Sequence, residues 1–358
     1  MSIKSSRHGG DVFGLSEEEQ DKVFDFSINI NPLGLSPKGR DALMAHWEKE
    51  TLRYPDVECR ALKKSLSIRY RISEESMALG NGATELMYKL VELLHPKKVI
   101  VPAPSFSEYR LSAEAAGCPV DSFLLTADQG FALPLEEIEK KLLPHSLIYL
   151  GHPNNPDGQL LSPPDFEAVL HLAKKKESFL IIDESFIDFV GDDVSYRRVL
   201  VNETCGAVVM SLTKFYAVPG LRIGAAFLHP ALAERLRDTL IPWNVNGLAQ
   251  SYMTAAAQDL DYIKDSRGYC QTEREKLSAA LEALDFVKVL PGSVNFILCQ
   301  LIGKFETAGK LQKALMPYHI FIRQCGNYEG LGETYFRVAV RTEEENQILI
   351  KALGAVEN

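Results

Sequence analysis

The sequence contains no apolar run long enough to cross a bilayer and no cysteine or histidine spacing typical of a metal site. A membrane-spanning helix needs roughly 20 consecutive apolar residues, and the first ten residues also lack the apolar core of a secretory signal peptide. The six cysteines form no C-x-x-C pair, and the eight histidines form no H-x-x-x-H pair. These absences argue against a zinc site and against a disulfide framework. We therefore expect a cytoplasmic protein that binds no metal ion.

The chain also lacks an excess of basic residues, an internal repeat and a low-complexity tract. Its formal charge of −9 argues against a nucleic-acid-binding protein, which usually carries a basic domain or stripe. The composition, 46% hydrophobic and 24% charged, is that of an ordinary globular protein, and 358 residues suffice for a substantial core in two lobes. These figures remain compatible with a small anionic substrate that is held by a few arginines.

Short apolar runs alternate with helical patterns between about residue 77 and residue 228. The apolar runs lie at 98–101, 147–150, 179–182 and 207–210, and helical patterns lie at 84–94, 107–116 and 165–176. This alternation predicts an α/β fold with a mainly parallel sheet and helices on both faces. Ligands of such sheets bind beyond the carboxyl ends of the strands.

The character of the chain changes after about residue 242. Long charged helical patterns at 249–284 precede two strand candidates at 293–299 and 334–340, which predicts a smaller α+β lobe. The segment 29–34 reads Asn-Ile-Asn-Pro-Leu-Gly, and we expect it to be too irregular for a core element.

Residues 211–224, Ser-Leu-Thr-Lys-Phe-Tyr-Ala-Val-Pro-Gly-Leu-Arg-Ile-Gly, follow a short apolar run and carry the most informative pattern. Lys214 lies where a predicted strand meets a loop, a usual place for catalytic side chains. A lysine amine can form a Schiff base with a carbonyl compound such as pyridoxal 5'-phosphate. Ser211, Thr213 and Arg222 would then donate hydrogen bonds to the cofactor's phosphate. Alone, however, the pattern is more typical of a surface lysine after a strand.

A glycine-containing turn, Gly-Asn-Gly-Ala-Thr-Glu at 80–85, opens one of the predicted helices. Its free backbone N–H groups and the helix dipole suit a phosphate group. An ordinary N-cap, in which Thr84 or Asn81 satisfies the first helical turn, explains the same residues.

Two polar motifs follow predicted strands of the same sheet. The turn 153–158 carries Asn155, whose amide can donate to the cofactor's phenolic oxygen, although Pro, Asn and Gly also form plain turns. Asp183 ends a buried run, where a carboxylate needs a partner such as a protonated pyridine nitrogen, or caps a helix. Asn155, Asp183 and Lys214 agree in order and spacing, so together they predict a pyridoxal phosphate site.

With these motifs the chain resembles the fold-type I pyridoxal phosphate enzymes along nearly its whole length, most of all the branch that contains histidinol-phosphate aminotransferase. The resemblance implies a seven-stranded, mainly parallel sheet flanked by helices and a smaller α+β domain. It implies an N-terminal arm with part of the small domain at 1–44, a large domain at 45–244 and a small domain at 245–358.

The same resemblance assigns the cofactor ligands. It implies that Lys214 forms the Schiff base, that Asp183 pairs with the pyridine nitrogen and that Asn155 binds the phenolic oxygen. The phosphate ligands that it implies are the backbone of Ala83 and Thr84 and the side chains of Ser211, Thr213 and Arg222. Phe106 would stack on the ring, and Tyr54 would reach the phosphate of the neighbouring subunit in a homodimer.

Two regions are more similar to the threonine-phosphate decarboxylases. One is His-Gly-Gly at 8–10 followed by the segment 25–34, and the other is the segment 322–328 ahead of 335–341. This resemblance implies decarboxylation of O-phospho-L-threonine to (R)-1-amino-2-propanol phosphate in cobalamin biosynthesis. The substrate-binding residues that it implies are His8, Gly9, Asn29, Asn155, Arg323 and Arg337. Without it, the histidine would be a solvated side chain, Asn29 a turn residue and both arginines surface residues.

Two positions depart from the pattern of the aminotransferases. Phe186 stands where that group usually has a tyrosine that donates to the phenolic oxygen, which favours a member that does not transaminate. Asp157 stands where threonine is usual, and we assign it no function. The alternatives are an aminotransferase acting on histidinol phosphate or an aromatic amino acid, and a non-catalytic pyridoxal phosphate-binding protein. Against the latter, Lys214 is present and the chain has no spare basic helical segment.

Overall fold

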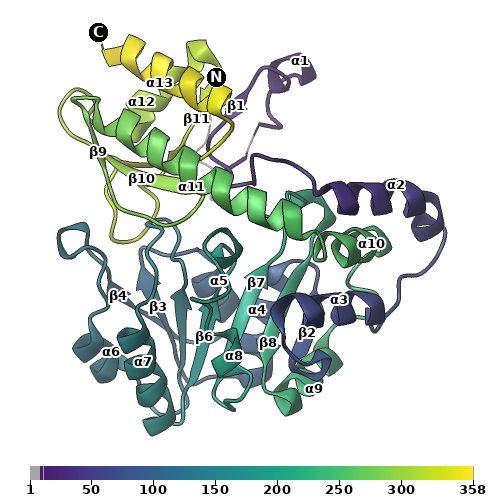
Figure 1. Cartoon of the computed structure of the whole chain (residues 1–358). Coiled ribbons are helices and arrows are strands. Elements are labelled where there is room, and N and C mark those ends of the chain that lie inside the picture. The colour runs from purple at the N-terminus through teal and green to yellow at the C-terminus, as the bar shows by residue number, and fades with distance from the viewer. Residues whose placement is uncertain (1–8, 11, 358) are drawn as a thin grey trace.

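A seven-stranded sheet forms the centre of the larger lobe in the computed structural model, which describes residues 9, 10 and 12–357 (Figure 1). The strands follow the order β2-β8-β7-β6-β5-β3-β4 across the sheet. Their bounds are Met77–Gly80 (β2), Val99–Ala103 (β3), Val120–Leu124 (β4), Leu147–Gly151 (β5), Phe179–Asp183 (β6), Gly206–Ser211 (β7) and Gly224–Leu228 (β8). Strand β8 pairs antiparallel with β2 and β7, whereas the other neighbouring pairs are parallel. The predicted mainly parallel, seven-stranded sheet is confirmed.

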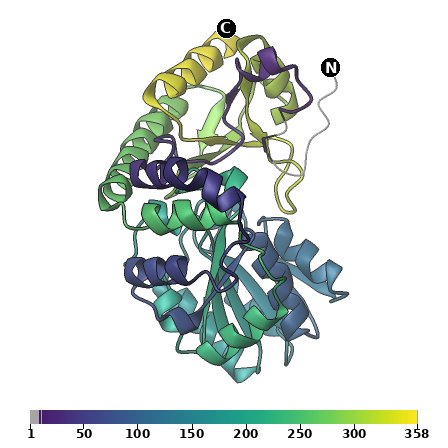
Figure 2. The ribbon, with the colours of Figure 1, turned by 90° about the vertical axis from the view of Figure 1, so that its right-hand side faces the viewer.

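Helices cover both faces of this sheet (Figures 1 and 2). Their bounds are Arg60–Tyr70 (α3), Ala83–Leu94 (α4), Glu108–Ala115 (α5), Leu135–Lys141 (α6), Pro163–Lys175 (α7), Arg197–Leu200 (α8), Pro230–Thr239 (α9) and Gly247–Ala256 (α10). Alternate residues of each central strand face opposite sides, so Ile148 and Leu180 pack with α3 and α7 while Leu147 and Phe179 pack with α4 and α9. Burial on both faces explains why these strands read as continuous apolar runs.

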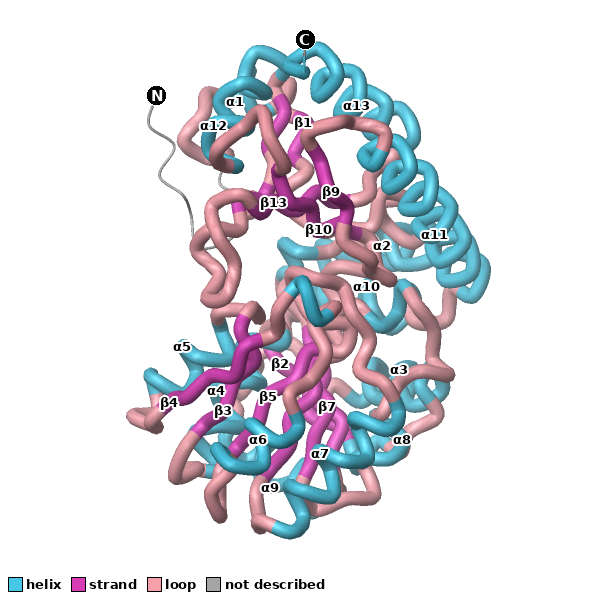
Figure 3. Tube along the Cα trace, turned by 90° about the vertical axis from the view of Figure 1, so that its left-hand side faces the viewer, coloured by secondary structure: helices cyan, strands magenta, loops and turns pink. Residues whose placement is uncertain are grey.

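The smaller lobe contains a four-stranded antiparallel sheet in the order β12-β13-β10-β9. Its strands are Val287–Val289 (β9), Phe296–Leu301 (β10), Arg323–Gln324 (β12) and Tyr335–Ala339 (β13), and its helices are Leu260–Glu282 (α11), Ala308–Leu315 (α12) and Glu343–Glu357 (α13). Figure 3 shows that loop segments lie between the strands of the two sheets. Those loops carry most of the residues discussed below.

The N-terminal segment joins both lobes through α1 (Glu17–Gln20), β1 (Phe24–Asp25) and α2 (Pro37–Thr51). Strand β1 pairs in parallel with β11 (Ile320–Phe321), so the start of the chain forms part of the smaller lobe. Helix α2 begins at the N-cap Ser36, whose hydroxyl accepts from the backbone N–H of Gly39, and has proline in its first turn.

Residues 29–34 form no helix or strand, as expected for so irregular a segment, but they are not all exposed. Asn31 is buried, and Phe26 just before them is fully buried in the core of the smaller lobe. The Asn31 amide donates to the Phe215 carbonyl at 2.8 Å and to the Tyr262 hydroxyl at 2.9 Å. Side-chain hydrogen bonds therefore satisfy a buried backbone that has no regular secondary structure.

None of the helices among the described residues is both long and apolar enough to cross a membrane.

Candidate active site

The polar residues singled out by the sequence gather at one edge of the seven-stranded sheet. Strands β3, β5, β6 and β7 are mutually parallel and end at Ala103, Gly151, Asp183 and Ser211. Their carboxyl ends therefore lie along the same edge, which is where ligands of such sheets bind. The turns that carry Phe106, Asn155 and Lys214 follow directly.

Lys214 lies in a sheltered environment at this edge. Its ammonium nitrogen is 5.9 Å from the centre of the Phe186 ring. Burial lowers the pKa of Lys214 to about 8, with Arg222 acting in the same direction and the Asp183 carboxylate acting against it. Lys214 is therefore not the surface lysine of the alternative interpretation, and at neutral pH part of it is present as the free, nucleophilic amine.

The start of helix α4 forms an anion-binding cradle. Its N-cap is Gly82, at φ +85°, and no side chain of the N-cap residue caps the first turn. A Cβ atom on Gly82 would lie 2.6 Å from Arg222 Nη2, so only glycine lets the guanidinium approach this backbone. The first N–H groups of α4, the positive end of its dipole and Arg222 thus converge where an anion would bind.

Two hydroxyl groups complete this cradle from the end of β7. Ser211 Oγ and Thr213 Oγ1 lie 2.8 Å apart, and both side chains are buried. The backbone N–H of Ser211 donates to Ser185 Oγ at 3.0 Å, which ties the end of β7 to the turn after β6. Ala83, at the start of α4, is buried against Gly224 of β8.

Asp183 is a buried carboxylate that two neutral groups hold. One oxygen accepts the backbone N–H of Ser185 at 2.9 Å, and the other accepts the hydroxyl of Tyr109 at 2.8 Å. In the described part of the chain, no lysine, arginine or histidine lies within ion-pair distance of Asp183. A buried charge without a counter-ion is costly, so this carboxylate points to a cationic group on a ligand.

The sequence interpretation missed Tyr109 as a member of this site. Tyr109 is the second residue of α5 and follows Phe106 by three positions, and the two rings meet edge to face at 5.9 Å. The backbone N–H of Tyr109 donates to the Phe106 carbonyl at 3.2 Å, so the turn that leads into the helix brings the two rings together. That spacing, after the motif Pro-Ser-Phe, was the available signal.

Arg337 faces this edge from the smaller lobe. Its side chain is 5% exposed, and its Nη1 donates to Asn155 Oδ1 while its Nη2 donates to the Ser27 carbonyl at 3.1 Å. With its amide oxygen turned toward the guanidinium, Asn29 accepts from both terminal nitrogens at 3.2 Å. Burial lowers the pKa of Arg337, and its Nε has no hydrogen-bond acceptor in the described residues.

Arg323 lies directly opposite Arg337 in the antiparallel pair β12–β13. It is also 5% exposed, so neither arginine is the surface residue of the alternative interpretation. Its Nη2 donates to Asn327 at 3.0 Å, and its guanidinium lies 5.1 Å from the centre of the Tyr328 ring. A cavity of about 340 Å³, lined in part by Phe106 and Arg323, lies beside this pair.

Three predicted site residues remain, Gly9, His8 and Tyr54. Gly9 lies against Ser27, and a Cβ atom there would come 2.3 Å from the Ser27 carbonyl oxygen. His8 lies outside the described residues. Tyr54 is 80% exposed and packs on Trp243 at 4.8 Å, so within one chain it does not join the site.

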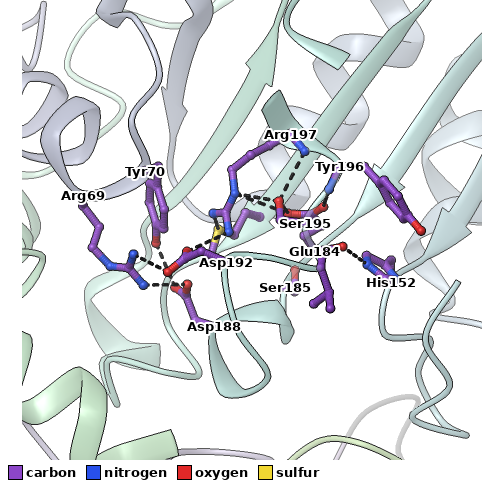
Figure 4. A network of polar contacts seen from close by, with 12 residues as sticks. Arg69, Tyr70, His152, Glu184, Ser185, Asp188, Asp192, Ser195, Tyr196 and Arg197 are labelled. Carbon is purple, nitrogen blue, oxygen red and sulfur yellow. Dashed lines mark hydrogen bonds and ion pairs between the residues drawn. The ribbon is translucent and has the colours of Figure 1, made fainter. Parts of the chain in front are cut away.

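A buried ionic network supports the turn after β6 (Figure 4). Glu184, next to Asp183, accepts from Ser195 Oγ at 2.6 Å and from the backbone N–H of Tyr196 at 2.7 Å. Arg197 lies 3.7 Å from Glu184 and 3.1 Å from Asp192. Burial alone would lower the pKa of Arg197, but the nearby carboxylates raise it overall, so this cation stays charged.

The residues present fit pyridoxal phosphate, the cofactor expected from the sequence. The cradle at α4 offers N–H, hydroxyl and guanidinium donors for its phosphate, and Asp183 offers an unpaired carboxylate for its ring nitrogen. Lys214 offers an amine of lowered pKa for its carbonyl carbon. No cluster of metal-ligating side chains competes for this edge among the described residues.

Comparison with known proteins gives consistent results. The family named aminotransferase class I and II matches residues 21–353. Threonine-phosphate decarboxylase of Salmonella typhimurium is 32% identical, over 99% of this chain and 98% of that protein. The adenosylcobalamin biosynthesis bifunctional protein CobDQ of Leptospira interrogans is 33% identical over 98% of this chain, which spans only 41% of that longer protein. The crystal structure of histidinol-phosphate aminotransferase from Clostridium acetobutylicum superposes with a TM-score of 0.85 at 31% identity, over 93% of this chain and 98% of that one.

Proposed function

This chain belongs to the aminotransferase class I and II family of pyridoxal 5'-phosphate enzymes, and we propose that it decarboxylates O-phospho-L-threonine to (R)-1-amino-2-propanol phosphate in cobalamin biosynthesis. The similarity to threonine-phosphate decarboxylase over nearly both full lengths supports this choice within the family. The observation that carries the proposal is the pair of buried arginines in the smaller lobe.

Arg323 and Arg337 stand directly opposite each other on neighbouring strands, where two like charges repel. Both are buried, and in the described residues Arg337 has no carboxylate partner. A substrate with two anionic groups, a phosphate and a carboxylate, relieves that repulsion, and guanidinium groups bind both bidentately. O-Phospho-L-threonine has these two groups on a short carbon chain.

The residues at the sheet edge then take the roles implied by the family. The α4 cradle, with the backbone of Ala83 and Thr84 and the side chains of Ser211, Thr213 and Arg222, binds the cofactor's phosphate. Asp183 pairs with the ring nitrogen, Asn155 donates to the phenolic oxygen, and Phe106 packs on the ring. When bound, pyridoxal phosphate supplies an electron sink for the pair of electrons left on Cα as CO₂ departs.

Lys214 holds the cofactor before substrate binds and handles a proton afterwards. Its lowered pKa keeps a fraction of the amine neutral near pH 7, which bond formation to the cofactor requires. After the substrate has bound, Lys214 in its ammonium form, or a water beside it, would deliver a proton to Cα, which takes the place of the departed CO₂.

The arginine pair also selects which bond breaks. Binding of the substrate's phosphate, away from the reacting bond, would fix the orientation of Cα and thereby which of its bonds breaks. Asn155 connects the two sides, because its side chain accepts from Arg337 and lies in the turn after β5. Gly9 packs against Ser27, and Asn29 accepts from Arg337. We propose that both residues bind the substrate, and we propose the same role for His8.

Product analysis tests the proposed reaction. The purified enzyme with O-phospho-L-threonine should release CO₂ and form the phosphorylated amino alcohol without consuming 2-oxoglutarate. Formation of glutamate from 2-oxoglutarate, without CO₂, would instead support an aminotransferase, the activity of the structurally similar enzyme from Clostridium acetobutylicum. O-Phospho-L-serine assayed alongside would measure how much the substrate's methyl group contributes, which in a typical pocket is about 1–3 kcal/mol.

We further propose a homodimer in which Tyr54 reaches the partner's cofactor phosphate. Tyr54 packs on Trp243, which is 50% exposed, and Trp47 of the preceding helix α2 is 56% exposed. Apolar patches of this kind mark association surfaces. Sedimentation should give about twice the chain mass of 39.9 kDa, and a species of the single chain mass would contradict the dimer.

Two coarser proposals complete the description. We propose the division into 1–44, 45–244 and 245–358, because the seven-stranded sheet falls within the second range and the four-stranded sheet within the third. We also propose a cytoplasmic location, which is supported by six cysteines that are free thiols, five of them buried.

A further inference from the structure

Tyr109 connects the carboxylate at the end of β6 to the helix that starts beside Phe106. Its hydroxyl donates to Asp183 Oδ2 at 2.8 Å, and its side chain is almost fully buried. Burial raises the pKa of Tyr109 well above its usual value, with the neighbouring Asp183 charge acting in the same direction. The hydroxyl therefore stays protonated and remains a hydrogen-bond donor over the working pH range.

The ring of Tyr109 is fixed from two directions. It stacks on the ring of Tyr149 from β5, with 4.8 Å between ring centres and 4° between ring planes. Its other neighbour is Phe106, which meets it edge to face. Since both rings restrict its rotation, the hydroxyl can reach only a narrow region, and Asp183 lies in that region.

Asp183 depends on few donors. Among the residues that the structure describes, the other donor to its carboxylate is the backbone N–H of Ser185, which bonds the other oxygen. A hydrogen bond to a carboxylate oxygen fixes its orientation, and such a charge-assisted bond is stronger in a site that excludes water. Removal of the Tyr109 hydroxyl would leave one oxygen of a buried carboxylate without a donor.

We infer that Tyr109 is a positioning residue for the cofactor's ring nitrogen, acting by holding the Asp183 carboxylate aimed at it. The inference rests on the proposed cofactor site, but it is independent of which bond of the substrate breaks. The Asp183 carboxylate would accept a hydrogen bond from the protonated ring nitrogen, and without the Tyr109 hydroxyl it would be aimed at that nitrogen less firmly. Tyr109 thus acts on the cofactor's ring nitrogen through Asp183, without contacting the cofactor itself.

The chain offers a matched control in Tyr149. It is as buried as Tyr109 and shares the stack, but its hydroxyl lies 3.3 Å from Ser112 Oγ and 3.4 Å from the Met87 carbonyl, not at Asp183. Tyr149→Phe therefore removes a buried hydroxyl from the same stack without changing the donors to Asp183. Comparable thermal unfolding midpoints for the two variant apoenzymes would show that both fold.

The test is a set of binding titrations on apoenzyme. Wild type, Tyr109→Phe and Tyr149→Phe are titrated with pyridoxal 5'-phosphate and with its carbocyclic analogue, in which a C–H group replaces the ring nitrogen. We expect Tyr109→Phe to weaken pyridoxal phosphate binding about tenfold, equivalent to about 1.4 kcal/mol, and to change analogue binding less than about twofold. Tyr149→Phe should change the affinity for either ligand by less than about twofold.

The inference would be overturned if Tyr109→Phe lost the same affinity for both ligands, or if both variants lost the same affinity for pyridoxal phosphate. In either case the hydroxyl would act only through packing. Failure of the wild type to bind pyridoxal phosphate would overturn it together with the proposed function. Transamination in the product assay would overturn the proposed reaction alone, and the titrations would still decide the role of Tyr109.

Discussion

The two sides of the site differ in how far apart in the sequence their residues lie. The cofactor side, which comprises the α4 cradle, Asp183 and the residues 211–222, is built from the ends of parallel strands in one sheet. The substrate side, which comprises Asn29, Arg323 and Arg337, brings together the N-terminal segment and two strands of the smaller lobe. Its parts are almost 300 residues apart along the chain.

This difference explains why the two sides can serve different purposes. The cofactor side is rigid because central strands, helices on both faces and a buried ionic network support it. A hydrogen bond from Arg337 to Asn155 joins the substrate side to the cofactor side. Substitutions on the substrate side can therefore change which molecule binds, and which bond breaks, while the cofactor is still held.

The largest effect is expected on the cofactor side, from Lys214→Ala. Loss of the amine removes both the covalent link and the proton donor, so turnover of O-phospho-L-threonine should fall at least about 10³-fold. Exposed Lys264 supplies the control variant Lys264→Ala, which should keep wild-type turnover. Turnover by Lys214→Ala within tenfold of wild type would remove Lys214 from the mechanism.

Arg337→Lys probes the substrate side with the charge retained. A lysine cannot reproduce the bidentate geometry, so kcat/KM should fall about 10²-fold while the affinity for pyridoxal phosphate stays within about twofold. The control is Arg235→Lys on the exposed face of α9 (Pro230–Thr239). If cofactor affinity fell as steeply as kcat/KM, the separation between the two sides would be wrong.

Acid should weaken the cofactor side through His152, in the turn before Asn155. The ring accepts the Leu161 N–H at 2.9 Å and donates to the Val194 carbonyl at 2.8 Å, and burial lowers the pKa of His152 from 6.5 to about 4. Because the pKa of His152 is lower in the folded state than in the unfolded state, neutral His152 contributes fully to the free energy of unfolding above about pH 6.5. That contribution is lost as the pH falls toward about 4. We expect about 2 kcal/mol of the unfolding free energy to disappear between pH 8 and pH 5.

Urea unfolding at several pH values measures this contribution of His152. In His152→Asn the slope of the unfolding free energy against pH should flatten over that range, whereas exposed His171, replaced by Asn, should leave the wild-type slope. A His152→Asn slope equal to that of the wild type would show that the acid sensitivity arises elsewhere.

The sequence was sufficient to predict that the residues of the cofactor side lie together, because its information is local. Each of Asn155, Asp183 and Lys214 follows an apolar run, and parallel strands bring their carboxyl ends to one edge without further information. The sheet order, with antiparallel β8 between β2 and β7, was not predictable from such runs, because the composition of a strand does not specify which strands it pairs with.

Contacts between distant segments account for what the sequence did not reveal. The irregular N-terminal segment is buried because Asn31 finds partners more than 180 residues away, which no local pattern signals. Tyr109 was overlooked since its partner Asp183 lies 74 positions further along the chain.

Asp157 was left without a role by the sequence. In the structure it is buried and accepts a hydrogen bond from Asn154, and burial raises the pKa of Asp157 to about 6. Nothing in the structure explains why aspartate stands there.

The most direct test of the central claim is to locate the cofactor on the chain. The enzyme with pyridoxal 5'-phosphate is reduced with borohydride, which makes the link to the lysine permanent, then digested and analysed by mass spectrometry. The account predicts one modified peptide, with the added mass on Lys214. A modification on another lysine, or an unmodified Lys214 in enzyme that has bound cofactor, would contradict it.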